Sequence, residues 1–313
     1  MYRFILHHRK KVDAEYLQLF SHVSWDNKAN TYDTIVKKYS ELSFLNNIKY
    51  KDLFVMPFDK LVGIYYDYIA VADKISVTDV QTLHECFPYD NHSSDKIMPF
   101  IERHTQHTEA TTCPYCDCRG IQIFQRRDTR RNYHLDHYLD KGRCPLVAMS
   151  LYNLLPVCPD CNTEKGANTF GNDKESTIML SPFSSKYDFE NQVPITVLPK
   201  NKKDILKIRS FVALKKYVIT LDFRQAPIYE QEVQITKIRE RFYSDLTSSE
   251  HSAMMEIYRH IVDRNHIYSK LDEMSRTESL SSDFYLPSKS KHKKGIRRLY
   301  DKFIRDTIKQ YTK

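Results

Sequence analysis

Two cysteine pairs form the strongest chemical pattern in this chain. Cys113-Pro-Tyr-Cys116 and Cys158-Pro-Asp-Cys161 share one spacing, and 41 residues lie between them. Each pair can present two thiolates from a tight turn, and two such turns supply the four sulfur ligands of a tetrahedral zinc ion. Four thiolates leave no open coordination position, so we expect a structural zinc that takes no part in chemistry.

The chain has three further cysteines, Cys86, Cys118 and Cys144. We expect them to be buried or free thiols, and Cys118 is the only one close enough in sequence to compete for the zinc. A redox dithiol is the alternative explanation of the paired cysteines, but a redox centre needs one pair and not two.

Further polar residues lie between and just after the two pairs. Asp136-His137 and Asn153 lie between the pairs, and Asn162 directly follows Cys161. In their order and spacing, residues 113 to about 170 resemble the HNH (ββα-metal) endonuclease family, as an H-N-N variant; the resemblance implies that Asp136-His137 ends one strand and that Asn153 lies at a second. Besides these residues, the resemblance is carried by Leu154-Leu155 before Cys158 and by Lys165-Gly166 after Asn162. Asp140-Lys141 stands where many relatives carry Pro-Lys, which leaves the conformation of that loop open.

The resemblance implies metal-dependent cleavage of phosphodiester bonds, with a 5′ phosphate and a 3′ hydroxyl as products. We expect His137 to be the general base, because a histidine pKa of about 6.5 suits proton abstraction from water near neutral pH. The resemblance assigns Asp136 and Asn162 to a catalytic Mg²⁺ or Mn²⁺ ion, which prefers oxygen ligands. It assigns Asn153 to holding the loop that orients the base.

Basic side chains surround the Asp-His segment. They would neutralise backbone phosphates, which gives affinity without sequence choice. His134 lies two residues before Asp136, hence on the same face of a strand, where it contacts phosphate or metal or only caps the strand. Tyr133 and Tyr138 could stack on bases, or belong to the core. The nucleic-acid contacts that we predict are His134, Arg126, Arg127, Arg130, Arg131 and Lys165.

The charge of the chain is concentrated at its C-terminal end. The formal net charge is +8, and residues 284–313 hold ten Lys and Arg against two Asp, so the rest of the chain is balanced. Such a segment is typical of polyanion binding, or of a solvated helix face. No apolar run resembles a secretory leader or spans a bilayer, so we expect a cytoplasmic protein without a membrane partner.

The catalytic residues require elements that position them. Apolar spacing predicts helices over about 12–23, 31–42, 58–74, 78–86 and 94–104, a short strand at 195–198, strand or mixed structure at 211–223, and helices over 230–275 and 294–311. The expected fold class is α+β: a ββα-metal core with zinc knuckles, flanked by mainly helical regions. The expected regions are 1–108, a possible partner-binding region, 109–170, the nuclease core, and 171–313, which ends in the basic tail.

The chain has no Gly-rich phosphate loop of the G-x-x-x-x-G-K-[ST] type, so we expect no ATPase activity of its own. Its layout resembles bacterial anti-phage HNH nucleases such as the PtuB-like group of Septu systems, which implies a defence nuclease controlled by a separate ATPase. DNA is favoured over RNA as substrate. The alternatives are a stand-alone restriction-type or homing-type nuclease and a non-catalytic zinc module that binds nucleic acid.

Overall fold

The computed structural model describes residues 3, 4, 6, 9–105, 112–121, 131–199, 217–238, 240, 302, 305 and 306. These residues form helices and two small antiparallel sheets, which agrees with a mixed α and β composition. Contacts divide the chain into two compact units. The helical unit comprises Tyr2–Ala110 and Ile121–Asp188, and the second unit comprises Met1, Thr111–Gly120 and Phe189–Lys313.

The N-terminal part of the helical unit consists of helices joined by short 3-10 turns. Helix α3 (Phe58–Ile69) is amphipathic, and Leu61, Tyr65 and Tyr68 are among its buried residues, at the i, i+4, i+7 spacing that places side chains on one face. Ser76 is the N-cap residue of helix α4 (Val77–Cys86), and its hydroxyl accepts a hydrogen bond from the Asp79 backbone nitrogen. The helices are α1 (Arg9–Gln18), α2 (Val23–Lys38), α3 (Phe58–Ile69), α4 (Val77–Cys86), α5 (Tyr89–His92) and α6 (Met98–Thr105).

The first helices differ from the sequence prediction. A helix was expected over 12–23 and a second from 31, whereas α1 ends at Gln18 and α2 begins at Val23. His22 has an extended backbone and its Nδ1 accepts a hydrogen bond from the Ser24 backbone nitrogen, so it caps α2. Leu19 and Phe20 lie in the turn after α1 and pack onto the core. Their apolar side chains therefore extended the helical spacing in the sequence beyond the real end of the helix.

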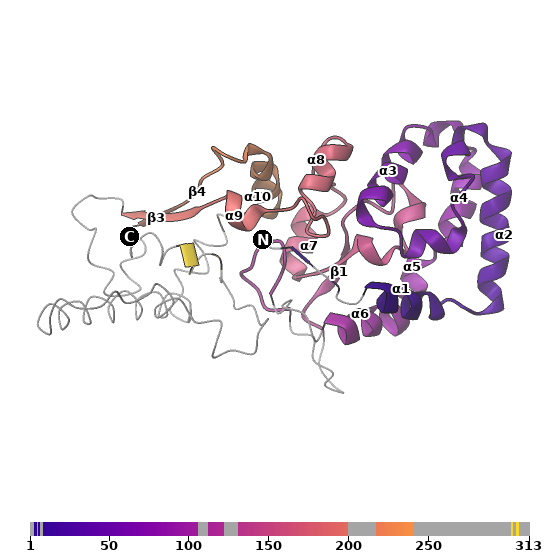
Figure 1. Ribbon diagram of the computed structural model, residues 1–313, viewed down its shortest axis with the longest axis horizontal. Helices are drawn as coiled ribbons and strands as arrows, with labels where there is room; N and C mark the ends of the chain where they lie inside the picture. The colour runs from indigo at the N-terminus through magenta and orange to yellow at the C-terminus, as the bar shows by residue number, and fades with distance from the viewer. Residues whose placement is uncertain are drawn as a thin grey trace, which may run out of the picture. The chain divides into compact units, whose positions relative to one another are not determined.

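Aromatic rings fill the core beneath these helices. Phe20 packs against Trp25 at 4.9 Å and Phe54 at 5.2 Å between ring centroids, both edge to face. In Figure 1, α2 runs beside α4, and both lie in the indigo to purple part of the chain.

The N-terminal helices also pack onto the segment expected to be the nuclease core. The Tyr16 hydroxyl donates to the carbonyl of Met149 at 2.9 Å, and the Phe58 ring contacts Tyr138 at 5.4 Å. Both contacts lie within the helical unit, which comprises Tyr2–Ala110 and Ile121–Asp188. The three regions expected from the sequence stay a prediction.

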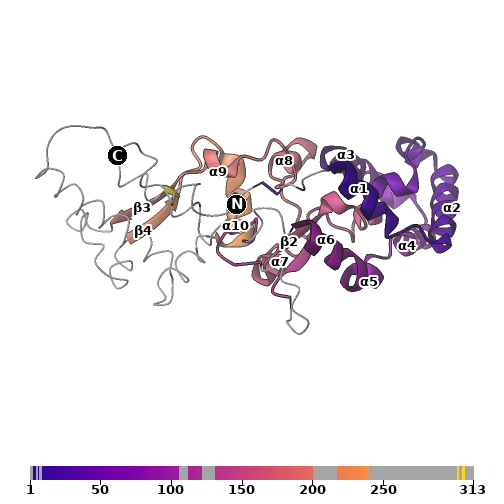
Figure 2. The ribbon, with the colours of Figure 1, turned by 60° about the horizontal axis from the view of Figure 1, so that its bottom comes forward.

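Two strands and a helix follow each other in this segment. Strand β1 (His134–His137) pairs antiparallel with β2 (Leu154–Val157), with Asp136 opposite Leu155. Helix α7 (Pro159–Lys165) contacts β1, as Figure 1 shows, and follows β2 directly, as Figure 2 shows. Gly166 ends α7 with a φ of 52°, a value that L side chains rarely adopt. Helix α8 (Lys174–Met179) completes this unit.

The second unit contains the other sheet. Strand β3 (Ile195–Pro199) pairs antiparallel with β4 (Tyr217–Leu221), which confirms the strand predicted at 195–198. Helix α9 (Phe189–Gln192) precedes β3, and α10 (Glu230–Thr236) follows β4. Lys237, with a φ of 49°, ends α10. The rest of the helix expected over 230–275 and most of 294–311 lie outside the described residues.

Two basic residues of the C-terminal segment are bonded inside the second unit. Lys302 is 1% exposed, and its ammonium donates to Asp306 Oδ2 and to the Glu190 carbonyl, both at 2.7 Å. Arg305 pairs with the Glu190 carboxylate. These two side chains therefore stabilise the unit, although the sequence analysis placed them in a segment typical of polyanion binding. Within the described part of the chain, no helix is long and apolar enough to cross a membrane.

Candidate metal centre and active site

The second cysteine pair begins helix α7. Cys158 is the N-cap residue, Pro159 occupies the first turn, and the Cys161 backbone nitrogen donates to the Cys158 sulfur at 3.5 Å. Proline is well suited to this position because its missing N–H would have no partner in the helix. The local sequence thus fixes both sulfurs in one turn.

The first cysteine pair lies in a separate tight turn. Thr112 and Gly120 form a β-bridge that closes it, and the Cys113 carbonyl accepts from the Asp117 backbone nitrogen at 2.8 Å. Asp117 has a left-handed φ of 58° and its carboxylate accepts from the Thr112 hydroxyl at 2.7 Å. Asp117 also accepts from the Lys302 backbone nitrogen at 3.1 Å, so the C-terminal segment supports this turn.

The four sulfurs gather in one buried cluster. The Sγ atoms of Cys113, Cys116, Cys158 and Cys161 all lie within 4.8 Å of one another. Tetrahedral zinc with Zn–S bonds of about 2.3 Å requires sulfurs about 3.8 Å apart, so the donor set fits a structural metal such as zinc. Cys118 is outside the cluster, and its thiol donates to the Cys116 carbonyl at 3.0 Å.

One face of β1 opposes one face of α7. Because side chains alternate along a strand, His134 and Asp136 project to the same side. On α7, Asn162 and Lys165 are three residues apart and share a face. The Asn162 amide nitrogen donates to His134 Nδ1 at 3.3 Å, and the Lys165 ammonium donates to Asp136 Oδ1 at 3.0 Å. The structure therefore brings two pairs of predicted residues into contact, His134 with Asn162 and Asp136 with Lys165.

Lys165, which we predicted as a contact to nucleic acid, lies buried between α7 and β1. Its side chain is 1% exposed, that of Asp136 is 4% exposed, and the ammonium also donates to the His137 carbonyl at 2.8 Å. A buried ammonium needs such partners, because an unpaired charge away from water is very costly. The contacts of Lys165 bind the last turn of α7 to the end of β1.

Replacing Lys165 with methionine is expected to lower the free energy of unfolding by about 3–5 kcal/mol in metal-free buffer, because Asp136 loses an ion-pair partner in a buried site. Urea denaturation would measure this. Lys174→Met is the matched control, since its pair with Asp67 is exposed and is worth about 0–1 kcal/mol. Equal effects of the two substitutions would contradict a stabilising role for the buried pair.

His137 projects to the other side of β1, as the alternation requires. Its Nε2 lies 3.0 Å from the Ala148 carbonyl, and its ring packs edge to face against Tyr89 at 4.3 Å. A carbonyl only accepts, so Nε2 carries the hydrogen and Nδ1 is left as the basic nitrogen. Burial lowers the pKa of His137 to about 3, with a further decrease from the Lys141 and Lys165 ammonium groups. The ring is therefore neutral at physiological pH.

Asn153 holds the loop between the two strands. It is fully buried; its Oδ1 accepts from the Leu139 backbone nitrogen at 2.7 Å, and its Nδ2 donates to the carbonyls of Leu139 at 3.0 Å and Val147 at 3.1 Å. One side chain thus connects both ends of the loop. Ala148, the partner of His137, directly follows Val147, so Asn153 also positions the carbonyl that orients the imidazole.

Asn153→Ala is expected to lower the free energy of unfolding by about 3 kcal/mol, because one backbone donor and two carbonyls lose buried hydrogen bonds. Chemical denaturation would measure the loss. Asn168→Ala is the control, since the Asn168 side chain makes one hydrogen bond, to the Lys165 carbonyl at 2.8 Å. A loss no larger than that of the control would show that the loop keeps its shape without the amide.

The predicted arginines and the two tyrosines are either bonded within the protein, buried in its core or outside the described residues. Arg131 pairs with Glu102 at 2.6 Å, and Glu102 also accepts from the Tyr133 hydroxyl at 2.7 Å. Tyr133 and Tyr138 are buried, so both belong to the core and neither is placed to stack on a base. Arg126, Arg127 and Arg130 lie outside the described residues.

Sequence reasoning missed two partners of the site, Tyr89 and Ala148. Tyr89 lies 48 positions before His137, in a helix without any recognisable motif, and Ala148 acts through its backbone carbonyl. Nothing in the sequence marked either of them. Comparisons with protein-family models, with curated proteins and with solved structures gave no significant match.

Proposed function

We propose that this protein is a metal-dependent endonuclease of the HNH type with a structural zinc. The observation that carries the proposal is the opposition of β1 and α7, which places His134 against Asn162 and Asp136 against Lys165. The loop held by Asn153 and the buried cluster of four cysteines give further support. These features come from separate parts of the sequence and agree with one chemistry, the hydrolysis of a phosphodiester bond.

Asp136 and Asn162 would hold the catalytic divalent ion. A carboxylate and a carboxamide oxygen are donors that Mg²⁺ and Mn²⁺ prefer, and the nitrogen of Asn162 is already used by His134, which leaves Oδ1 for a cation. When bound, such an ion neutralises the charge that develops on the phosphate and on the leaving oxygen. The Lys165 ammonium, 3.0 Å from Asp136 Oδ1, holds this carboxylate in place.

His137 would take the proton from the attacking water at Nδ1. The hydrogen bond from Nε2 to the Ala148 carbonyl fixes the ring and its tautomer, and Tyr89 packs against the ring. A neutral imidazole is the form that a general base requires. The low pKa makes His137 a weaker base than an ordinary histidine.

The polymer would be gripped mainly by its phosphates, with Arg126, Arg127 and Arg130 as the proposed contacts, and DNA is favoured over RNA. We also propose that the nuclease serves in anti-phage defence and that a separate ATPase controls it. Co-purification of the tagged chain with an ATPase from its native host tests the partner. A chain that is isolated alone and cuts without restraint would argue for a stand-alone nuclease.

A non-catalytic zinc module that binds nucleic acid is the second candidate. The ion pair between Asp136 and Lys165 favours it, because the ammonium already neutralises the carboxylate that a divalent ion would use. The low pKa of His137 points the same way.

Cleavage of plasmid DNA and of total RNA by the purified, zinc-loaded chain separates the two candidates. Each substrate is incubated with Mg²⁺, with Mn²⁺, and without added divalent metal, and the zinc content is measured before and after. Cutting that depends on Mg²⁺ or Mn²⁺ is expected and identifies the polymer. Binding of both polymers without cutting, by a folded protein that still holds zinc, would favour the binding module.

A further inference from the structure

The Lys165 side chain places a positive charge at a carboxylate that the proposed catalytic ion would use. Its ammonium donates to Asp136 Oδ1 at 3.0 Å and to the His137 carbonyl oxygen at 2.8 Å. Carboxylate and carbonyl oxygens are also the donors that Mg²⁺ and Mn²⁺ prefer in proteins. The ammonium therefore binds, at the end of β1, oxygen atoms of the kind that a divalent ion takes as ligands.

The ion pair leaves no room for a second cation on the same oxygen. Both side chains are buried, so water does not separate or screen the charges. Mg²⁺ lies about 2.0–2.1 Å from its oxygen ligands, and a divalent ion this close to an oxygen that already accepts from an ammonium would be repelled by it. An ion that binds Asp136 Oδ1 must therefore displace the ammonium.

Lys165 can release the carboxylate without unwinding α7. It is the last residue of the helix, and its ammonium stands on a flexible four-carbon chain. Its backbone is held separately, because its carbonyl accepts from Asn168 Nδ2 at 2.8 Å and from the Asn168 backbone nitrogen at 3.0 Å. Rotation about the side-chain bonds alone moves the ammonium away from Asp136.

We propose that Lys165 is an internal cation, which occupies the divalent-ion site of the metal-free protein and is displaced when Mg²⁺ or Mn²⁺ binds. The choice of a divalent ion rests on the proposed nuclease function, and the occupied carboxylate rests on the contacts above. A site that is open in about 1–10% of the molecules raises the apparent Kd of its ligand about 10- to 100-fold. Lys165 thus lowers the affinity for the ion, and the buried ion pair is the metal-free state of the site.

Mn²⁺ binding to the folded, zinc-loaded full chain tests the competition, with free Mn²⁺ followed by electron paramagnetic resonance. Lys165→Met is expected to bind Mn²⁺ about 10- to 100-fold more tightly than the wild type. Lys165→Gln is expected to change the affinity in the same direction, since it keeps an N–H donor for the His137 carbonyl but carries no charge. Adding Asp136→Ala to Lys165→Met is expected to remove the gain.

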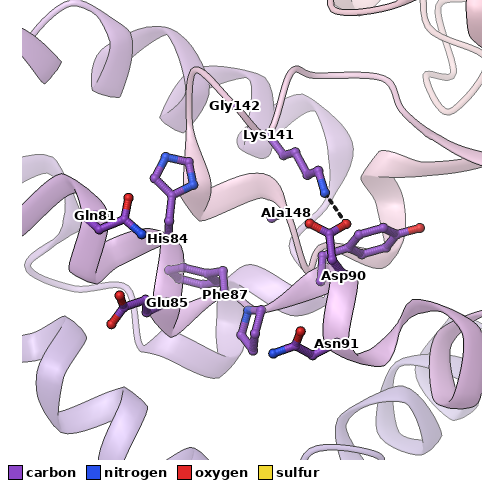
Figure 3. Close-up of a pocket in the computed structure, with 11 residues that line it drawn as sticks. Gln81, His84, Glu85, Phe87, Asp90, Asn91, Lys141, Gly142 and Ala148 are labelled. Atoms are coloured by element: carbon purple, nitrogen blue, oxygen red, sulfur yellow. Dashed lines mark hydrogen bonds and ion pairs between the residues drawn. The ribbon is translucent and has the colours of Figure 1, made fainter.

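Lys141→Met is the matched control, because it removes the same charge from the loop that follows β1. The Lys141 ammonium pairs with Asp90 at 2.6 Å, as Figure 3 shows, and both side chains reach solvent. Asp90 is not a proposed metal ligand, so this substitution changes the net charge without freeing the site. The Mn²⁺ affinity is expected to stay within about 3-fold of the wild type, since solvent screens an exposed charge.

Acetylation of lysines in the wild-type chain gives a second readout that needs no substitution. Lys165 is buried in the metal-free protein, so we expect it to react slowly with acetic anhydride and faster at saturating Mg²⁺, as measured by peptide mass spectrometry. Lys174, whose pair with Asp67 is exposed, is the reference lysine and is expected to react equally in both conditions.

The proposal is overturned if both Lys165 variants bind Mn²⁺ no more tightly than the wild type, since the ion would then bind beside a retained ammonium. An equal gain in Lys141→Met, a gain that survives Asp136→Ala, or no increase in Lys165 acetylation would also overturn it. A chain that cuts nucleic acid but gives one of these results loses the internal cation alone. A chain that behaves as expected toward Mn²⁺ but never cuts loses the nuclease proposal alone.

Discussion

Replacing His137 with alanine is expected to lower the rate of metal-dependent cleavage about 100- to 10,000-fold, the range that a general base contributes. The imidazole is held by the Ala148 carbonyl and the Tyr89 ring with Nδ1 as its basic nitrogen, and within the described residues no second histidine is hydrogen-bonded to that carbonyl. Plasmid nicking under single-turnover conditions measures the rate. The zinc content is expected to stay at the wild-type value, because His137 is not part of the cysteine cluster.

His22→Asn is the control for this substitution. His22 is exposed and caps α2, and asparagine is itself a favourable N-cap residue, so fold and cleavage are both expected to persist. Retention of cleavage by a folded His137→Ala protein would refute His137 as the base. His134 would then be the next residue to test, since it lies on the face that contacts Asn162.

Replacing Cys158 with serine is expected to have the largest effect on stability. The substitution removes one of four clustered thiolates and also the sulfur that accepts from the Cys161 backbone nitrogen. Structural zinc contributes apparent binding free energies of about 10–16 kcal/mol in small zinc domains, so we expect bound zinc to fall well below one equivalent and the Tm to drop sharply. Elemental analysis and thermal unfolding measure the two effects.

Cys118→Ser separates loss of a ligand from loss of a cysteine. Cys118 lies two positions after Cys116 but outside the cluster, and a serine hydroxyl can make the same donation to the Cys116 carbonyl. This variant is expected to keep its zinc and its Tm within a few degrees of wild type. Full zinc occupancy in Cys158→Ser, or zinc loss in Cys118→Ser, would mean that the metal is bound by a different set of ligands.

Local sequence determined the parts of the site that depend on short spacings. Each Cys-x-x-Cys pair forms its own turn, and α7 begins at Pro159 and is ended by Gly166. The gathering of the four cysteines was predicted correctly because metal-ligand spacing is a property of single turns. Helix boundaries before residue 60 were less accurate, since apolar residues of a turn imitate helical spacing.

The tertiary structure decided what surrounds each functional group. The sequence does not distinguish a lysine on the surface from one in a buried ion pair. The packing of α7 against β1 directs the Lys165 ammonium to Asp136. From the sequence alone we expected an ordinary histidine pKa for His137. In the fold, burial against Tyr89, a residue from a distant helix, lowers this pKa. The hydrogen bond from His137 to the Ala148 carbonyl uses a backbone atom that every residue has, so no residue type in the sequence indicates it. Burial, pKa and such contacts arise between segments far apart in the chain, so residue types and local spacing do not determine them.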